Sequence, residues 1–214
     1  MHIQAVIDKL QLTEEPGVLA SQSKSKFKDT FTKAVEVFFG SIITHEDVSS
    51  DAFILSTGLG NSENILRLIN NYRNKKFVSA QLFPEATMSS ASVNINRIHK
   101  IHGGNITANI ALSINDALLL AMLDAVENNR SIHVIHGEVN ALKNHHGQHN
   151  YLLYMKVSPC DIGTHLSLRA DNKVSNIKQM KPLSLHLKDI MSPALFDITS
   201  NQNTYGEVAD VYLN

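Results

Sequence analysis

The stretch from Asn105 to Val126 constrains the fold most, because it joins a strand pattern to a helix that is apolar on every side. Alternating apolar and polar residues predict a strand with one buried face over 105–110. A turn at Leu112 and Ser113 then leads into the apolar run 117–123. Such a helix must be enclosed, either between two sheet layers or beneath a partner subunit.

Further strands and helices alternate around this stretch. A helix over 29–42 precedes the buried strand "DAFILST", and "SIHVIHGE" returns as a strand after the apolar helix. This β-α-β-α-β order favours the α/β class, with a layered, mixed and largely parallel sheet around a buried central helix.

The last third of the chain changes character. The stretches "YLLYMKVS" and "THLSLRA", separated by "PCDIG", predict two strands joined by a turn. The stretch 197–214 carries no clear pattern. We therefore expect a single domain over 1–214, with a core at 1–140 and a strand pair with a C-terminal tail at 150–214.

Glycines mark two breaks in the pattern. Gly58 and Gly60 permit a sharp turn into a helix, but Glu63 stands where a dinucleotide fingerprint requires its third glycine. We interpret this turn as structural. A later helix is predicted to end at Gly103 and Gly104.

Composition excludes several classes of function. The formal net charge of -1 gives no general attraction to nucleic acid or anionic lipid. The single cysteine, Cys160, cannot form an internal disulfide, which fits a reducing, cytoplasmic compartment. The N-terminus lacks the layout of a signal peptide, and no apolar run approaches the roughly 20 residues of a membrane span. Lys24, Lys26 and Lys28 alternate in a polar loop that we interpret as a solvated face, a docking patch for an acidic partner being the alternative.

Histidines are the first candidates for chemistry. His145, His146 and His149 cluster in "LKNHHGQHN", where two of them would share a helix face. The glycine and amides favour a loop, and no complete ligand set is present, so we expect neither a metal nor a cofactor. His133 and His136 fall on opposite faces of a strand and cannot serve one site from regular geometry.

Nucleophiles are equally few. Cys160 follows Pro159 at a turn, with no base in the pattern to lower its pKa. Ser113 is better placed, because helix amides could stabilise an oxyanion beside it. With Asp116 three residues later, Ser113 more simply predicts a helix cap.

Four stretches in order carry a family resemblance: "STGLG", "FPEATMSSASVNI", "HGGNITANIALSINDALLLAMLDAV" and "IHVIHGE". Together they resemble the N-terminal half of β-ketoacyl synthases of the thiolase superfamily. The resemblance implies a thiolase-like half, that is, a truncated ketosynthase. In that family a nucleophilic cysteine stands at the N-terminus of the buried helix.

This chain departs from the family at the nucleophile. Counting forward from Gly103 and Gly104 puts the cysteine position at Leu112, whereas counting back from Glu138 puts it nearer Ile110. Both residues are aliphatic, so we expect Leu112 and Ser113 to be an inactive equivalent of the nucleophile. The C-terminal half that carries the family's catalytic histidines is also missing, so the chain by itself is not expected to be an enzyme.

What remains similar is the half-length group called chain length factors, found in aryl polyene and related type II polyketide clusters. The resemblance implies a heterodimer with a full-length ketosynthase, with higher-order assembly also open, and contact with an acyl carrier protein through that complex. The strand bearing Ile106, Ala108 and Ile110 would pair across a pseudo-two-fold axis. The chain would shape the partner's acyl tunnel in polyketide or fatty-acid-like biosynthesis.

A small-residue segment corresponds to the part of the family that lines the partner's tunnel. Its residues are Thr87, Met88, Ser89, Ser90 and Ala91. Packing of this segment against its own sheet is an equal alternative. Three rival functions stay open: a stand-alone hydrolase or acyltransferase using Ser113, a histidine metal enzyme, and a homodimeric thiolase-fold binding module.

Overall fold

The computed structural model describes residues 5–58, 60–108, 114–139, 150–159, 166–168 and 209–211. The strands are β1 (Ala5–Thr13), β2 (Ala52–Ser56), β3 (Asn105–Ala108), β4 (Ile132–Glu138), β5 (Tyr151–Pro159), β6 (Leu166–Leu168) and β7 (Ala209–Val211). The helices are α1 (Pro16–Ser21), α2 (Thr30–Ile42), α3 (Ser62–Arg73), α4 (Leu82–Glu85), α5 (Ser90–His99) and α6 (Ile114–Asn128).

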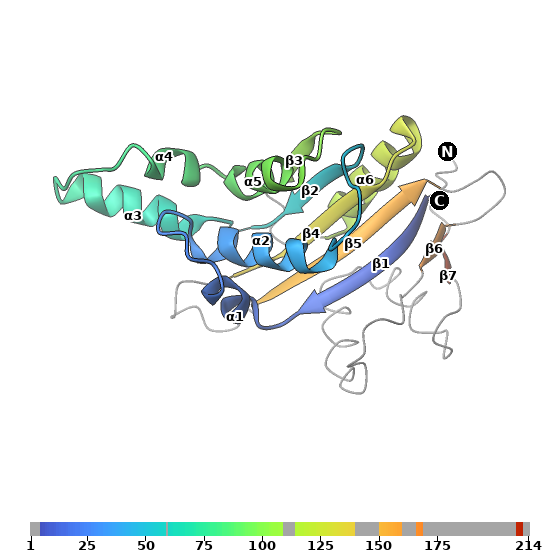
Figure 1. Cartoon of the computed structure of the whole chain (residues 1–214), viewed down its shortest axis with the longest axis horizontal. Coiled ribbons are helices and arrows are strands. Elements are labelled where there is room, and N and C mark those ends of the chain that lie inside the picture. The colour runs from blue at the N-terminus through green and yellow to red at the C-terminus, as the bar shows by residue number, and fades with distance from the viewer. Residues whose placement is uncertain are drawn as a thin grey trace.

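The strands form one mixed sheet in the order β3-β2-β4-β5-β1-β6-β7 (Figure 1). The predicted α/β class with a mixed sheet is confirmed. Parallel pairing is less extensive than predicted: it joins β3, β2 and β4, and it joins β1 to β6. The strand β5 runs antiparallel to both β4 and β1.

The two strands predicted in the last third are present as β5 and β6, but their expected pairing with each other is wrong. β5 and β6 are not neighbours, because β1 lies between them. The strand β1 pairs with β5 along most of its length, from Ala5 opposite Pro159 to Thr13 opposite Leu152. Strands that follow one another in the sequence were expected to pair, but the N-terminal strand β1 lies between β5 and β6 in the sheet.

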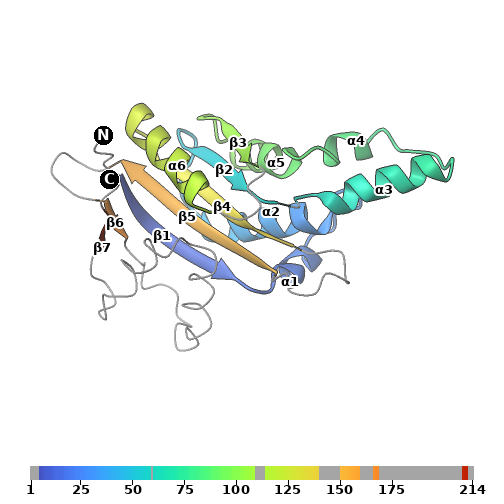
Figure 2. The ribbon, with the colours of Figure 1, turned by 180° about the vertical axis from the view of Figure 1, so that it is seen from behind.

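Helices cover the two faces of the sheet unequally. On one face, Phe53 and Leu55 of β2 pack in a core with α2 and α5. On the other face, Ile54 of the same strand packs with α6. Figure 2 shows this second face, with α6 lying in front of the strands and running roughly along them. No helix in the described part of the chain is long and apolar enough to cross a membrane.

The predicted helix over 29–42 is α2. Its N-cap is Asp29, whose side chain accepts a hydrogen bond from the backbone N–H of Thr32 at 2.7 Å. Its fully buried Phe39 packs edge-on against the rings of Phe53 and His133, with centroid separations of 5.3 Å each. This aromatic contact fixes α2 over the centre of the sheet.

The helix α5 ends earlier than the glycines predict. It stops at His99, with Lys100 in the left-handed conformation. Gly103 serves a different purpose, because a Cβ there would lie 2.4 Å from the backbone oxygen of Asp51. The glycine therefore permits close approach of the chain just before β3 enters the sheet.

Candidate functional site

Polar side chains gather where the parallel strands β2 and β4 end. Ser56 is the last residue of β2 and lies opposite His136 in the register of the two strands. Both side chains are buried, with exposures of 0% and 5%. The carboxyl ends of parallel strands are the usual place for ligand sites in α/β sheets, so this edge is the candidate site.

A series of hydrogen bonds connects side chains of three strands at this edge. Ser56 Oγ lies 2.9 Å from His136 Nδ1, and His136 Nε2 lies 2.9 Å from the hydroxyl of Tyr151 on β5. Burial lowers the pKa of His136 to about 4. Burial, together with the charge of Glu138, raises the pKa of Tyr151 to about 12. At neutral pH the imidazole is therefore uncharged and the phenol is protonated.

A serine and an imidazole at this distance have the spacing of a nucleophile and its base. The hydroxyl of Ser56 is completely enclosed, however, so a substrate cannot reach it in this conformation. The arrangement satisfies the hydrogen bonds of the buried Ser56 and His136 side chains through the half-buried Tyr151 at the end of the sheet. We interpret it as structural support for the edge.

Glu138 ties the ends of β2 and β4 together. Its carboxylate accepts hydrogen bonds from Thr57 Oγ1 at 3.2 Å and from the backbone N–H of Gly58. The Thr57 hydroxyl in turn accepts from the backbone N–H of Gly60 at 2.9 Å. The turn after β2 is thus fixed from both sides, as its interpretation as a structural turn requires.

Asn61 attaches the small-residue segment to this turn. Its side-chain amide donates to the carbonyl oxygens of Glu85 at 2.8 Å and Thr87 at 2.5 Å, and to Ser90 Oγ at 3.2 Å. Asn64 on the first turn of α3 donates to the same Glu85 carbonyl at 3.1 Å. Two asparagines that carry no recognisable motif therefore set the position of the predicted tunnel segment.

The five residues of the predicted tunnel segment divide into two groups. Ser90 and Ala91 are buried, at 6% and 1% exposure, and pack within the chain itself. Thr87 is exposed, while Met88 and Ser89 are half-buried. The structure thus turns one end of the segment inward and leaves the other accessible.

Met88 lies against the glycine turn. A Cβ built on Gly60 would lie 3.3 Å from Met88 Cε, and Gly60 has a φ of +51°. This contact brings the thioether to the same edge of the sheet as Thr57. Met88 is consequently the predicted tunnel residue whose side chain contacts the glycine turn, while Thr87 and Ser90 reach the site through their hydrogen bonds to Asn61.

The strand β3 forms one end of the sheet, and its outer edge is flanked by apolar side chains. Ile106 is 42% exposed, and Ala108 is half-buried. Val93 and Ile98 are exposed on α5, which contacts β3. Leu119, Leu120 and Val126 are exposed on α6, which packs mainly over β4 and β5. The helix α6 buries only one stripe on its own sheet, so the enclosure predicted from its sequence is incomplete within the described residues.

Several predicted site residues lie outside the described part of the chain. They are Ile110, Leu112, Ser113, His145, His146, His149 and Cys160. His133, by contrast, is fully buried and lies 2.8 Å from both an Asp51 carboxylate oxygen and the Tyr154 hydroxyl. It faces the α2 side of the sheet, whereas His136 bonds to Tyr151 beside the α6 core, as strand alternation predicts.

Sequence reasoning missed Ser56, Asn61 and Tyr151 as members of the site. Ser56 and Tyr151 carry a weak signal, because each stands at the end of a strand that was predicted correctly. Their pairing with His136 depends on the order of strands in the sheet. No group of three or more His, Cys, Asp or Glu within the described ranges could hold a metal ion.

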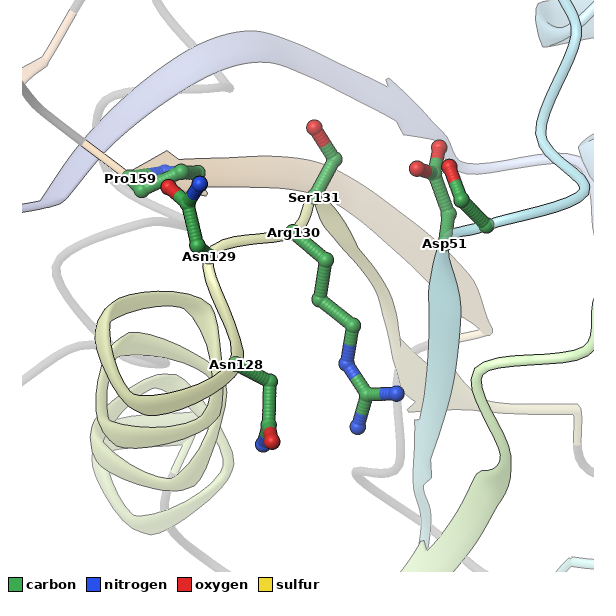
Figure 3. Close-up of a pocket in the computed structure, with 7 residues that line it drawn as sticks. Asp51, Asn128, Asn129, Arg130, Ser131 and Pro159 are labelled. Carbon is green, nitrogen blue, oxygen red and sulfur yellow. The ribbon is translucent and has the colours of Figure 1, made fainter.

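A hollow lies at the other end of β2 and β4, away from the candidate site (Figure 3). It has a volume of about 540 Å³ and lies between Asp51 and the α6–β4 connection, which contributes Asn128 to Ser131. Its charged groups are already paired: the Arg130 guanidinium contacts the Asp124 carboxylate at 2.7 Å, and Asp51 bonds to His133. None of the predicted site residues that fall within the described ranges lines this hollow.

Comparison with known proteins identifies the fold. No family model matches the sequence, and no curated protein matches it. A structure of the ketosynthase ApeO in complex with its chain length factor ApeC from Xenorhabdus doucetiae is similar, with a TM-score of 0.54 and 13% identity over 73% of this chain and 79% of that chain. The ishigamide ketosynthase/chain length factor is also similar, with a TM-score of 0.53 and 12% identity over 67% of this chain and 48% of that chain. The chain therefore has the thiolase-like α/β fold of ketosynthase and chain length factor structures, as the resemblance of its sequence predicted.

Proposed function

We propose that this chain is a chain length factor subunit, which pairs with an active β-ketoacyl synthase and shapes the acyl tunnel of that partner. The observation that carries the proposal is the apolar surface around the outer edge of β3. This surface consists of Ile106 on β3 with Val93 and Ile98 on α5, the helix that contacts β3.

The edge strand supports pairing with a second subunit. β3 bonds to β2 on one side, and none of the other strands that the structure describes pairs with its outer edge. An uncovered edge offers backbone donors and acceptors to another strand, and natural proteins normally protect such edges. Here the flanking side chains are aliphatic, which favours burial against a complementary surface.

The helix α6 supports the same conclusion from the other face. Leu119 and Leu120 are 42% and 40% exposed, although they lie in the run 117–123, which is apolar on every side of the helix. A partner subunit that covers this helix would complete the enclosure that such a sequence requires. One side of this helix would then be covered by its own sheet and the other side by the partner subunit.

The tunnel segment supports a shaping role. At its accessible end, the carbonyl of Thr87 accepts a hydrogen bond from the amide of Asn61, and Met88 lies against Gly60. A wall that sets chain length needs a fixed shape and apolar or small side chains, not an acid or a base. The residues at the aligned nucleophile position, Leu112 or Ile110, are aliphatic, which agrees with a subunit that performs no condensation itself.

The proposed pairing with a ketosynthase also implies the other partners and the pathway class of this chain. The partner would be a full-length ketosynthase in a heterodimer, and an acyl carrier protein would deliver the growing chain to that complex. The pathway class would be aryl polyene, other type II polyketide, or fatty-acid-like biosynthesis. Cysteine use and composition favour the cytoplasm as its location.

Co-expression with the neighbouring full-length ketosynthase, followed by size exclusion, tests the pairing. We expect a one-to-one complex, and we expect Ile106→Lys to abolish it by placing a charge in the apolar surface. Val18→Lys is the matched control, because Val18 is 56% exposed on α1, away from β3. If the chain is stable by itself and does not co-elute with the ketosynthase, the proposal is overturned. The homodimeric module and a Ser113 enzyme then become the next hypotheses.

A further inference from the structure

The helices α2, α3 and α5 begin at one junction, where polar contacts connect their first turns. The Asn61 amide at the start of α3 donates to Ser90 Oγ at the start of α5, at 3.2 Å. The Ser90 hydroxyl lies 3.5 Å from the hydroxyl of Thr32, in the first turn of α2. Thr32 in turn donates its backbone N–H to Oδ1 of the α2 N-cap, Asp29, at 2.7 Å. All four residues are buried.

Two buried oxygens at this junction have no hydrogen-bond partner. They are Asp29 Oδ2 and Asn61 Oδ1, on residues that are 2% and 1% exposed. The third such atom among the described residues, Asn96 Oδ1, belongs to a half-buried residue. A buried polar atom without a partner costs free energy, so a native protein normally supplies a water molecule, an ion or a proton there.

Reversal of the Asn61 amide does not supply a partner. The amide nitrogen already faces three acceptors, which are the carbonyl oxygens of Glu85 and Thr87 and the Ser90 hydroxyl. A reversed amide would place its oxygen against two carbonyl oxygens, which cannot donate. Asn61 Oδ1 is therefore an acceptor that needs either a donor or a cation.

The junction carries an excess of negative charge. Burial, and to a smaller degree repulsion by Glu63 and Glu85, raises the pKa of Asp29 to about 6. The neighbouring cation, Lys28, is paired with Glu36. No ion pair within the described residues neutralises Asp29, Glu63 or Glu85. At neutral pH a positive charge is therefore favoured at this junction over a neutral or an anionic ligand.

We propose that a monovalent cation of the size of Na⁺ binds at this junction, with Asp29 Oδ2 and Asn61 Oδ1 among its ligands. Carboxylate and amide oxygens are the usual ligands of hard cations. A divalent ion fits less well, because Ca²⁺ takes about six to eight oxygens and Mg²⁺ requires a nearly ideal octahedron. One carboxylate and one amide also distinguish this site from the acid-rich and histidine-rich metal sites, none of which occurs in the described ranges.

Close packing favours a small ion over water at these oxygens. Neither unpaired oxygen borders a space that admits a water molecule. Oxygen ligands lie about 2.3–2.6 Å from Ca²⁺, an ion close to Na⁺ in radius, whereas a water oxygen requires about 2.7–2.8 Å. The positive ends of the helices oppose a cation, but Asp29 and Glu63 already accept backbone N–H groups in the first turn of α2.

The bound cation would connect the cap of α2 to the residue that positions the tunnel segment. Asn61 binds Thr87 through its amide nitrogen and would bind the cation through its amide oxygen. The order of the segment would then depend on the cation as well as on the fold. This inference does not rest on the proposed function, because its tests measure the stability of the chain itself.

Thermal unfolding of the full chain at pH 8 tests the site, with NaCl compared with choline chloride at equal concentration. Choline has the same charge as Na⁺ but is too large for the junction, and the ionic strength is the same in both salts. We expect a saturable rise in melting temperature of about 3 °C or more in Na⁺. Equal melting temperatures in the two salts would overturn the proposal.

Competition with a proton gives a second test that needs no substitution. At pH 5 most of the Asp29 carboxyl is protonated, because its pKa is about 6. The rise in melting temperature caused by Na⁺ should therefore be smaller at pH 5 than at pH 8, by about half or more. A rise of the same size at both values of pH would place the ion elsewhere, and the proposal would be wrong.

The variant Asp29→Asn tests the ligand. Asparagine keeps the cap hydrogen bond with Thr32 but carries no charge, so Na⁺ should no longer raise the melting temperature. Glu127→Gln, at an exposed position, is the matched control and should keep the full effect of Na⁺. Retention of the Na⁺ effect in Asp29→Asn would contradict the proposal, and the comparison of pH 5 with pH 8 decides it if that variant does not fold.

Discussion

The hydroxyl of Ser56 lies 2.9 Å from Nδ1 of His136, although the two residues are 80 positions apart in the sequence. The parallel pairing of β2 with β4 creates this contact, since Ser56 and His136 are partners in the register. Glu138 and Asn61 then connect the same edge to the turn and to the segment that contains Met88. The edge of the sheet is therefore a rigid frame for the accessible residues above it.

Protonation of His136 should destabilise the protein at acid pH. Burial lowers its pKa from 6.5 to about 4, so the unfolded chain takes up this proton first as the pH falls. The stabilising contribution is complete above pH 6.5 and is lost between about pH 6.5 and 4. It amounts to roughly 3 kcal/mol at most.

Urea unfolding across this pH range measures the effect. His136→Gln should lose less stability between pH 6.5 and 4 than the parent protein, whatever its stability at pH 7. His102→Gln, at an exposed position, is the control and should follow the parent. Parallel curves for parent and His136→Gln would contradict the expectation.

Asp29 should have the opposite pH dependence. Burial raises its pKa from 3.8 to about 6, with Glu63 and Glu85 adding smaller repulsions. The folded state therefore binds its proton more tightly, and stability is lost as the pH rises from about 4 through 6. Relative to the parent, Asp29→Asn should gain up to about 3 kcal/mol between pH 4 and 7.

Asparagine is a suitable replacement at this N-cap, because it can still accept the hydrogen bond from Thr32. The measurement is again denaturant unfolding at each pH, with Glu127→Gln at an exposed position as the control. A constant difference between Asp29→Asn and the parent would show that Asp29 keeps its ordinary pKa.

Gly60→Ala should destabilise the turn by about 1–3 kcal/mol, because the left-handed φ of +51° strains any residue with a Cβ. The added methyl group also crowds Met88 Cε at 3.3 Å. Met88→Ala in the Gly60→Ala background should relieve this contact, and it should leave the backbone strain and the equally close contact with Thr57 Cγ2 at 3.3 Å. Thermal unfolding of the single and double variants separates the two, and full recovery in the double variant would contradict the role of φ.

Met88→Trp should shorten the product of the ketosynthase complex, because Met88 is half-buried at the accessible end of the tunnel segment. A larger ring there would reduce the space for the growing chain. Mass spectrometry of the product mixture measures the change, and Val18→Trp controls for added bulk elsewhere. An unchanged distribution of chain lengths from a stable complex would place the tunnel wall at other residues.

The sequence by itself determined the local elements and their class. Apolar alternation identified β2 and β4, and helical periodicity identified α2, α3 and α6, because each pattern depends only on neighbours along the chain. The order of these elements was sufficient to indicate the thiolase-like fold. It also marked Met88 and Ile106, which the structure places at the turn and at the sheet edge.

The tertiary structure decided what pairs with what. The insertion of β1 between β5 and β6 could not be read from the sequence, since the order of strands depends on contacts between distant residues. The same holds for the hydrogen bonds that connect Ser56, His136 and Tyr151. It holds also for the hydrogen bonds from the Asn61 amide to the carbonyl oxygens of Glu85 and Thr87. These side chains have no periodicity of their own, and they acquire their partners only when separate strands and helices pack together.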